Sequence, residues 1–198
     1  MKKLVIFDVD GVLSNSYPPH RQFCEDMNQK YNCGLTIPEN VVASPMDNLL
    51  RRAGFSEDII PKLLEEYQNF NDNYEVNLFD GVSEMFKSLT DMGVIIGVVS
   101  SNYTINIKNA LGDLASIPED IFGIDNSEGK VDGIMKIKNR LGIPLEDISY
   151  VGDLMKDYQV AVEAGVDFIG SGYGWEIRRF PIADSVSDIA TIIKLEGE

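Results

Sequence analysis

The sequence predicts an α/β fold in which a doubly wound parallel sheet carries a small helical insertion. Short apolar runs that end on polar residues alternate with amphipathic helical patterns, and one interval between two runs is too long for a single connection. Of the 198 residues, 44% are hydrophobic and 25% are charged, which is the balance of a globular chain and argues against disorder.

Five apolar runs fit buried strands. They cover residues 3–8, 94–99, 121–124, 148–151 and 166–169, and residues 184–195 fit a last strand and helix. Short runs that are apolar throughout are typical of parallel strands covered on both faces. The first and fourth runs lead directly into acids and glycine, so they deliver polar side chains at their carboxyl ends.

The segments between these runs predict helices, because apolar residues recur at helical spacing and a glycine follows each set. The sets are Val82, Met85, Phe86 and Leu89 before Gly93, Ile134, Ile137 and Leu141 before Gly142, and Leu154, Tyr158 and Ala161 before Gly165. Strands that alternate with helices imply a parallel sheet with helices on both faces.

The interval between the first two strands breaks this rhythm. Residues 9–93 far exceed the connection of a βαβ unit, which takes about 30 residues in all. Phe23, Met27 and Tyr31 share one helical face within it, and Ile60, Leu63, Leu64 and Tyr67 form another stripe. We therefore expect a small helical domain at residues 14–79 and a core domain formed by residues 1–13 and 80–198.

Charge and cysteine content narrow the class of partner. The chain has 17 Lys and Arg against 32 Asp and Glu, a formal charge of −15, so its average surface repels nucleic acid and anionic lipid. No apolar stretch approaches the ~18 residues of a membrane span. Cys24 and Cys33 lack metal-ligand spacing, which favours a reduced, cytoplasmic protein. Nothing in the sequence indicates an oligomeric state.

Asp8 and Asp10 stand at the end of the first strand and are followed by Gly11. Residues two apart on a strand point to the same side, and two carboxylates there repel each other unless a cation or a shared proton lies between them. The alternative is a polar strand end followed by a turn. The pair is therefore a candidate catalytic or metal site.

Ser100, Ser101 and Asn102 follow the second strand, where a helix is expected to begin near Tyr103. Hydroxyl and free backbone N–H groups at a helix N-terminus form an anion site. Ser and Asn are also good helix caps, and capping is compatible with binding a phosphate.

The third and fourth strands add a cation and two further acids. The third ends near Asp125 and is followed by Lys130, in the loop before the next helix, where a lysine at the surface is the alternative. Asp153 follows the fourth strand. If a helix begins at Leu154, Asp153 caps it and Asp157 faces the same region one turn later. Helix capping and dipole stabilisation are the alternative role of both acids.

The carboxyl ends of parallel strands meet at one edge of the sheet, so these residues converge. At this order and spacing they resemble the haloacid dehalogenase superfamily, in its phosphoglycolate phosphatase and β-phosphoglucomutase branch. Asp8-Val9-Asp10-Gly11-Val12 resembles its first motif, Ser100 the second, Lys130 the third, and Gly152-Asp153 with Asp157 the fourth. The resemblance implies a Rossmann-like core with an inserted helical cap, whose return segment resembles Phe79-Asp80-Gly81-Val82.

The resemblance implies a magnesium-dependent phosphatase that acts on a small phosphorylated metabolite. Asp8 would be the nucleophile that forms an aspartyl-phosphate, and Asp10 the acid and base. Mg²⁺ would be bound by Asp8, the backbone carbonyl of Asp10 and Asp153, with Asp157 as a further ligand or just outside the ligand set. Lys130 would bind Asp8 and the phosphate. Ser100, with the backbone N–H groups of Ser101 and Asn102, would bind another phosphate oxygen.

Two alternative functions stay open at this point. A phosphomutase of the same fold would keep the aspartyl-phosphate and return it to a sugar phosphate, and a catalytically silent binding protein could have kept the fold. Outside the motifs, Tyr173, Gly174 and Trp175 follow the fifth strand, and we interpret them as a structural turn carrying aromatic side chains.

Overall fold

The computed structural model describes residues 2–39, 41, 43, 45–175 and 182–195. The chain divides into two compact units, a core unit of Met1–Asn15 with Leu78–Glu198 and an insert unit of Ser16–Asn77. The sequence analysis set the boundary at residues 14 and 79, two residues outside this division at each end. Each unit has its own buried apolar cluster and is described separately.

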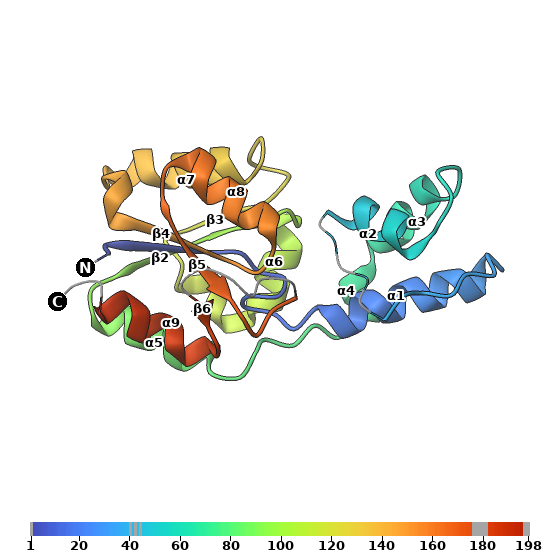
Figure 1. The fold of residues 1–198 in the computed structure, drawn as a ribbon, viewed down its shortest axis with the longest axis horizontal. Helices are drawn as coiled ribbons and strands as arrows, with labels where there is room; N and C mark the ends of the chain where they lie inside the picture. The colour runs from blue at the N-terminus through green and yellow to red at the C-terminus, as the bar shows by residue number, and fades with distance from the viewer. Residues whose placement is uncertain (1, 40, 42, 44, 176–181, 196–198) are drawn as a thin grey trace. The chain divides into compact units, whose positions relative to one another are not determined.

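The core unit contains a parallel sheet (Figure 1). Its strands are β1 (Leu4–Phe7), β2 (Ile95–Val99), β3 (Asp120–Phe122), β4 (Ile148–Gly152), β5 (Asp167–Ser171) and β6 (Ile182–Ala183). Their order is β3-β2-β1-β4-β5-β6, and every neighbouring pair is parallel. The order reverses between β1 and β4, and open parallel sheets bind ligands beyond the carboxyl ends of the strands at such a point.

Helices cover both faces of this sheet. Those of the core unit are α5 (Val82–Asp91), α6 (Thr104–Leu111), α7 (Lys130–Leu141), α8 (Met155–Ala164) and α9 (Val186–Leu195), with short 3-10 turns at Gly112–Ser116 and Leu145–Asp147. In Figure 1, α7 and α8 lie on one side of the sheet and α5 and α9 on the other. This confirms the doubly wound α/β fold that the sequence predicted.

The side-chain alternation of β1 explains how one short strand serves both faces. Val5 and Phe7 are fully buried in a cluster with residues of α5, α6 and α9, whereas Leu4 and Ile6 are fully buried among residues of α7 and α8. All four residues must therefore be apolar, and the strand has no polar side chain until it ends. The first position free to carry one is residue 8.

Three element boundaries differ from the predicted ones. The third strand ends at Phe122 and not near Asp125, because Gly123 donates its N–H to Asn126 Oδ1 and the chain turns away from the sheet. Lys130 is the first residue of α7 and not part of the preceding loop. The last strand, Ile182–Ala183, precedes the predicted segment 184–195.

The insert unit is built from helices, as predicted. They are α1 (Tyr17–Lys30), α2 (Met46–Ala53), α3 (Ile60–Tyr67) and the short α4 (Phe70–Asn73). Phe23 and Met27 of α1 and Ile60 and Leu63 of α3 are buried in one cluster, which confirms both predicted stripes. Tyr31 lies just beyond the end of α1 and packs partly buried against that cluster.

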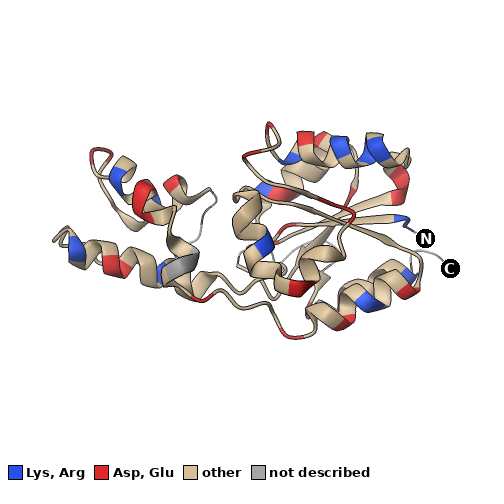
Figure 2. Cartoon of the chain, turned by 180° about the vertical axis from the view of Figure 1, so that it is seen from behind, with Lys and Arg blue, Asp and Glu red and all other residues tan. Residues whose placement is uncertain are grey.

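Charged residues lie on the helices and loops of both units. Figure 2 shows Lys and Arg interspersed with Asp and Glu along the helices. Within the described part of the chain, no helix is long and apolar enough to cross a membrane.

Candidate active site

Asp8 is the first residue after β1 and is buried, with 3% of its surface exposed. Its backbone N–H donates to Val151 of β4, so the ladder between the two strands still holds it. Oδ1 accepts the N–H of Val9 at 2.8 Å, and Oδ2 lies 2.6 Å from Lys130 Nζ. Burial raises the pKa of Asp8 to about 6, against the opposing charge of Lys130.

Asp10 lies in the loop beyond β1, which ends at Phe7. The prediction that Asp8 and Asp10 point to the same side of one strand is therefore wrong. Asp10 is half-buried, and the Ser14 hydroxyl lies 3.5 Å from its Oδ1. Gly11 turns the chain with a φ of 77°, and a Cβ there would lie 2.1 Å from Asp153 Oδ2. The loop therefore passes directly beside Asp153, which only a residue without a side chain permits.

Lys130 joins two of the acids. Its ammonium group is 2.6 Å from Asp8 Oδ2 and 2.7 Å from Asp157 Oδ1, and the residue is 8% exposed. Burial disfavours the charged amine, but Asp157 and Asp8 together hold the pKa of Lys130 well above its ordinary value. Lys130 is thus a buried, charged member of the cluster, and the alternative of a surface lysine is wrong.

Asp153 and Asp157 stand beside β4, and only one of them has the alternative role of a helix cap. Asp157 Oδ2 accepts the N–H of Leu154, the N-cap residue of α8, so Asp157 caps this helix and Asp153 does not. Asp153 is fully buried, and its Oδ2 accepts the N–H of Trp175 at 2.9 Å. Burial, with Asp157 and Asp8 adding to it, raises the pKa of Asp153 well above its ordinary value.

These acids fit a divalent cation. Asp8, Asp153 and Asp157 each offer one carboxylate oxygen, and the three oxygens lie within 4.8 Å of one another. Asp153 Oδ1 is buried with no hydrogen-bond partner within the described residues, a costly state for a carboxylate oxygen. Three carboxylates against one ammonium leave an excess of negative charge, and oxygen donors of this kind suit Mg²⁺. The carboxylate of Asp10 is not part of this group.

The loop after β2 brings one buried hydroxyl to the same edge of the sheet. Ser100 is 4% exposed, and its Oγ accepts the N–H of Asn102 at 3.3 Å. Asn102 Oδ1 accepts the N–H of Tyr103, the residue that precedes α6. Ser100, Ser101 and Asn102 lie together in the loop between β2 and α6, and all three stay candidates for binding a phosphate oxygen.

Two partners of this site were not predicted from the sequence. Asp125 Oδ1 accepts the N–H and the hydroxyl of Thr104, at 2.7 and 2.9 Å, which occupies the N-terminus of α6. Tyr150 of β4 is fully buried, with its hydroxyl 3.5 Å from Asp157 Oδ1 and its ring centre 5.9 Å from Lys130 Nζ. No sequence pattern distinguishes these two residues. Asp125 is one acid among many near a strand end, and Tyr150 is one more residue of a largely apolar strand.

Gly152 leaves room for Asp157, since a Cβ there would lie 2.3 Å from the Cβ of Asp157. We expect Gly152→Ala to lower the free energy of unfolding by about 1–3 kcal/mol, as overpacking does in a close-packed interior. Urea denaturation measures the change. Gly97→Ala is the matched control, because its methyl would meet the movable end of Ile137 at 2.9 Å. An equal cost at both positions would contradict a special constraint at Gly152.

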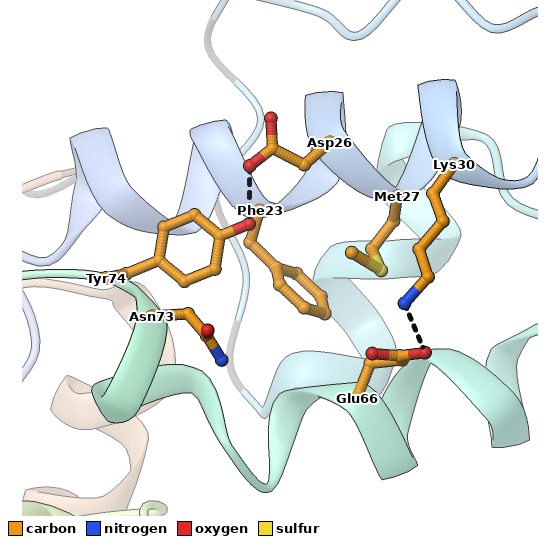
Figure 3. A pocket seen from close by; sticks show the side chains of 7 residues that line it. All are labelled: Phe23, Asp26, Met27, Lys30, Glu66, Asn73 and Tyr74. Atoms are coloured by element: carbon orange, nitrogen blue, oxygen red, sulfur yellow. Dashed lines mark hydrogen bonds and ion pairs between the residues drawn. The ribbon is translucent and has the colours of Figure 1, made fainter.

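The insert unit contains a pocket of about 380 Å³ (Figure 3). It is lined by Phe23, Asp26, Met27, Lys30, Glu66, Asn73 and Tyr74. Each charged group of the lining has a partner within it, because Asp26 Oδ2 accepts the Tyr74 hydroxyl at 2.6 Å and Lys30 Nζ lies 2.7 Å from Glu66 Oε1. The residues of the four motifs are not among those that line it, so this pocket is separate from the acid cluster.

Comparison with known proteins places the chain in a family. The model of the haloacid dehalogenase-like hydrolases matches residues 5–171. A phosphoglycolate phosphatase of Pseudomonas savastanoi pv. phaseolicola is 25% identical over 202 residues, 93% of this chain and 74% of the relative. The tyrosine-protein kinase PtkA of Mycobacterium tuberculosis is 28% identical over 186 residues, 87% of this chain and 63% of the kinase.

A solved structure has the same fold. The crystal structure of a predicted phosphoglycolate phosphatase of Haemophilus somnus 129pt superposes with a TM-score of 0.81 at 23% identity, covering 96% of this chain and 97% of that one. The family match spans all four motifs, which confirms the resemblance to this family that the motifs indicated. The chain therefore belongs to the haloacid dehalogenase-like hydrolase family, as a phosphoglycolate phosphatase-like enzyme.

Proposed function

We propose that the chain is a magnesium-dependent phosphatase that hydrolyses a small phosphorylated metabolite through an aspartyl-phosphate on Asp8. The observation that carries this proposal is the pairing of Asp8 with Lys130 at 2.6 Å beside a buried Asp153 oxygen that has no described partner. A nucleophilic carboxylate, a fixed ammonium group and a cation ligand are the parts that phosphoryl transfer needs together.

Asp8 would act as the nucleophile. Its Oδ1 is fixed by the N–H of Val9 and its Oδ2 by Lys130, so the carboxylate is held in one orientation. The attacking oxygen forms a bond to phosphorus as the bond to the leaving alkoxide breaks. Lys130, bound to Asp8 and Asp157, keeps its charge in the buried site and would bind a phosphate oxygen.

Asp10 would donate a proton to the leaving alkoxide and then accept one from the water that hydrolyses the aspartyl-phosphate. Its half-buried position and its contact with Ser14 support this role, because the carboxyl group is both held and reachable. The buried Ser100 hydroxyl and the backbone N–H groups of Ser101 and Asn102 would bind another phosphate oxygen.

Mg²⁺ would be held by oxygens of Asp8, Asp153 and Asp157 and by the Asp10 backbone carbonyl. When bound, it supplies positive charge that neutralises the carboxylates and the phosphoryl oxygens.

Two free cysteines, Cys24 and Cys33, support a reducing, cytoplasmic setting.

Phosphate release from a panel of phosphorylated metabolites tests the proposal. We expect release that needs Mg²⁺, stops when a chelator removes it and returns when Mg²⁺ is restored in excess, because the buried acids otherwise repel the anionic substrate. The order of turnover rates across the panel identifies the substrate.

Other outcomes would contradict the proposal in distinguishable ways. A folded chain that releases no phosphate but isomerises a sugar phosphate when a bisphosphate is present would be a phosphomutase. A folded chain that binds neither Mg²⁺ nor substrate would be a silent binding protein. Circular dichroism of the same sample establishes that the chain is folded.

A further inference from the structure

The segment of residues 171–175, which begins at the last residue of β5, contacts the loop that carries Asp8 and Asp10. The Ser171 hydroxyl donates to the carbonyl of Gly11 at 3.0 Å, and the Tyr173 hydroxyl donates to the carbonyl of Val12 at 2.9 Å. We call this segment the β5 strap. It is anchored to the first motif through two hydrogen bonds that the sequence did not indicate.

The β5 strap also binds Asp153. The backbone N–H of Trp175 donates to Asp153 Oδ2 at 2.9 Å, whereas Oδ1 of the same carboxylate has no partner within the described residues. Asp153 contributes one oxygen to the acid cluster with Asp8 and Asp157. A hydrogen bond to one carboxylate oxygen fixes the plane of the carboxylate, and it leaves the other oxygen available to a cation.

Gly174 sets the distance between the strap and the site. A Cβ at this position would lie 2.3 Å from the carbonyl oxygen of Gly11, 2.5 Å from Asp153 Cβ and 3.1 Å from Asp153 Oδ2. The first is a backbone atom and the second is the Cβ of a side chain, so neither can shift without moving the backbone. The glycine is required by close approach, and this approach is what lets the next N–H reach Asp153.

We propose that the β5 strap positions Asp153 for a divalent cation, with Gly174 and the backbone N–H of Trp175 as the positioning groups. This inference rests on the proposed function, since it concerns how the chain holds the cation of that site. It goes beyond the motifs, because the strap belongs to none of them. It also replaces the interpretation of Tyr173, Gly174 and Trp175 as a structural turn alone.

Tyr173 extends the same contact to the start of the return segment. Its ring packs edge-on against Phe79 with ring centres 5.0 Å apart, and Phe79 donates its N–H to the carbonyl of Leu13. The strap therefore touches the first-motif loop, the segment at residue 79 and Asp153. A shift of the strap would change the position of Asp153 relative to Asp8, which is the geometry that a cation shared by both must match.

Two substitutions test the strap directly. Gly174→Ala adds the methyl group that collides with Gly11 and Asp153, and Trp175→Pro removes the N–H that binds Asp153. Titration calorimetry with MgCl₂ alone should show Mg²⁺ binding about 10- to 100-fold weaker in both variants, the effect typical of residues that orient a metal ligand. The Mg²⁺ concentration that half-saturates phosphate release should rise in parallel, while the rate at saturating Mg²⁺ returns toward the wild-type value.

Two control variants separate positioning from loss of stability. Gly97→Ala also introduces a buried methyl, but it meets Ile137 and Ile6 and none of the acids, so Mg²⁺ affinity should be unchanged even if the melting temperature in chelator falls. Trp175→Ala keeps the backbone N–H and should recover most of the affinity that Trp175→Pro loses.

The outcomes separate this inference from the proposed function. If the wild type binds Mg²⁺ and both strap variants bind it equally well, the strap has no positioning role and the proposed function stands. If the strap variants lose affinity but the wild type hydrolyses no ester, the positioning role stands and the phosphatase proposal fails. A wild type that binds no Mg²⁺ overturns both.

Discussion

Asp8→Asn is expected to abolish phosphate release, with a turnover rate at least about 10³-fold below that of the wild type. The amide has the size and shape of the carboxylate, but its oxygen is a poor nucleophile towards phosphorus. Asp8 stands directly after β1, with Oδ2 2.6 Å from Lys130 Nζ and Oδ1 2.8 Å from the backbone nitrogen of Val9. Asp157 also binds Lys130, but its other oxygen caps α8. Phosphate release from the best substrate of the panel, at saturating Mg²⁺, measures the change.

The fold should survive this substitution. Burial raises the pKa of Asp8 and the charge of Asp157 adds to the effect, so removing the charge of Asp8 relieves both costs, and Lys130 keeps Asp157 as its partner. Asp91→Asn is the matched control, because Asp91 is an exposed acid of α5 paired with Lys87. A folded Asp8→Asn protein that releases phosphate at the wild-type rate would exclude the aspartyl-phosphate mechanism.

The positions of the functional acids could be predicted because strand burial restricts them. β1 packs against helices on both faces with alternate residues, which leaves no polar position before Asp8. Asp153 also stands directly after its strand, β4, and parallel pairing brings the two strand ends together. The sequence therefore predicted which residues meet, although not the distances between them.

Other features depended on contacts that have no sequence pattern. The end of β3 is set by the side chain of Asn126, which binds Gly123, and an apolar residue, Ile124, lies inside that turn. The N-terminus of α6 is occupied by Asp125 from another loop. The strap reaches Asp153 through a backbone N–H, which every residue except proline carries. Local propensity contains no information about such partners.

Lys130→Met is expected to destabilise the chain as well as inactivate it. Methionine keeps an unbranched apolar stem but removes the ammonium group that lies 2.6 Å from Asp8 and 2.7 Å from Asp157. Breaking a buried ion pair by removing one partner costs about 3–5 kcal/mol, because the remaining charge is desolvated and unpaired. Urea denaturation in the presence of chelator measures the free energy of unfolding. Lys87→Met, at an exposed pair on α5, should change it little.

A double-mutant cycle with Asp157→Asn tests whether the destabilisation by Lys130→Met arises from the carboxylates that lose their cationic partner. If it does, the double variant should be more stable than the sum of the single effects predicts, by about 0.5–3 kcal/mol, because the neutral amide that replaces the Asp157 carboxylate no longer needs a cation beside it. Mg²⁺ should also restore part of the stability of Lys130→Met, since ions that bind only the folded chain stabilise it. Strictly additive effects, with no response to Mg²⁺, would mean that Lys130 contributes through packing alone and that the acids do not share a cation site.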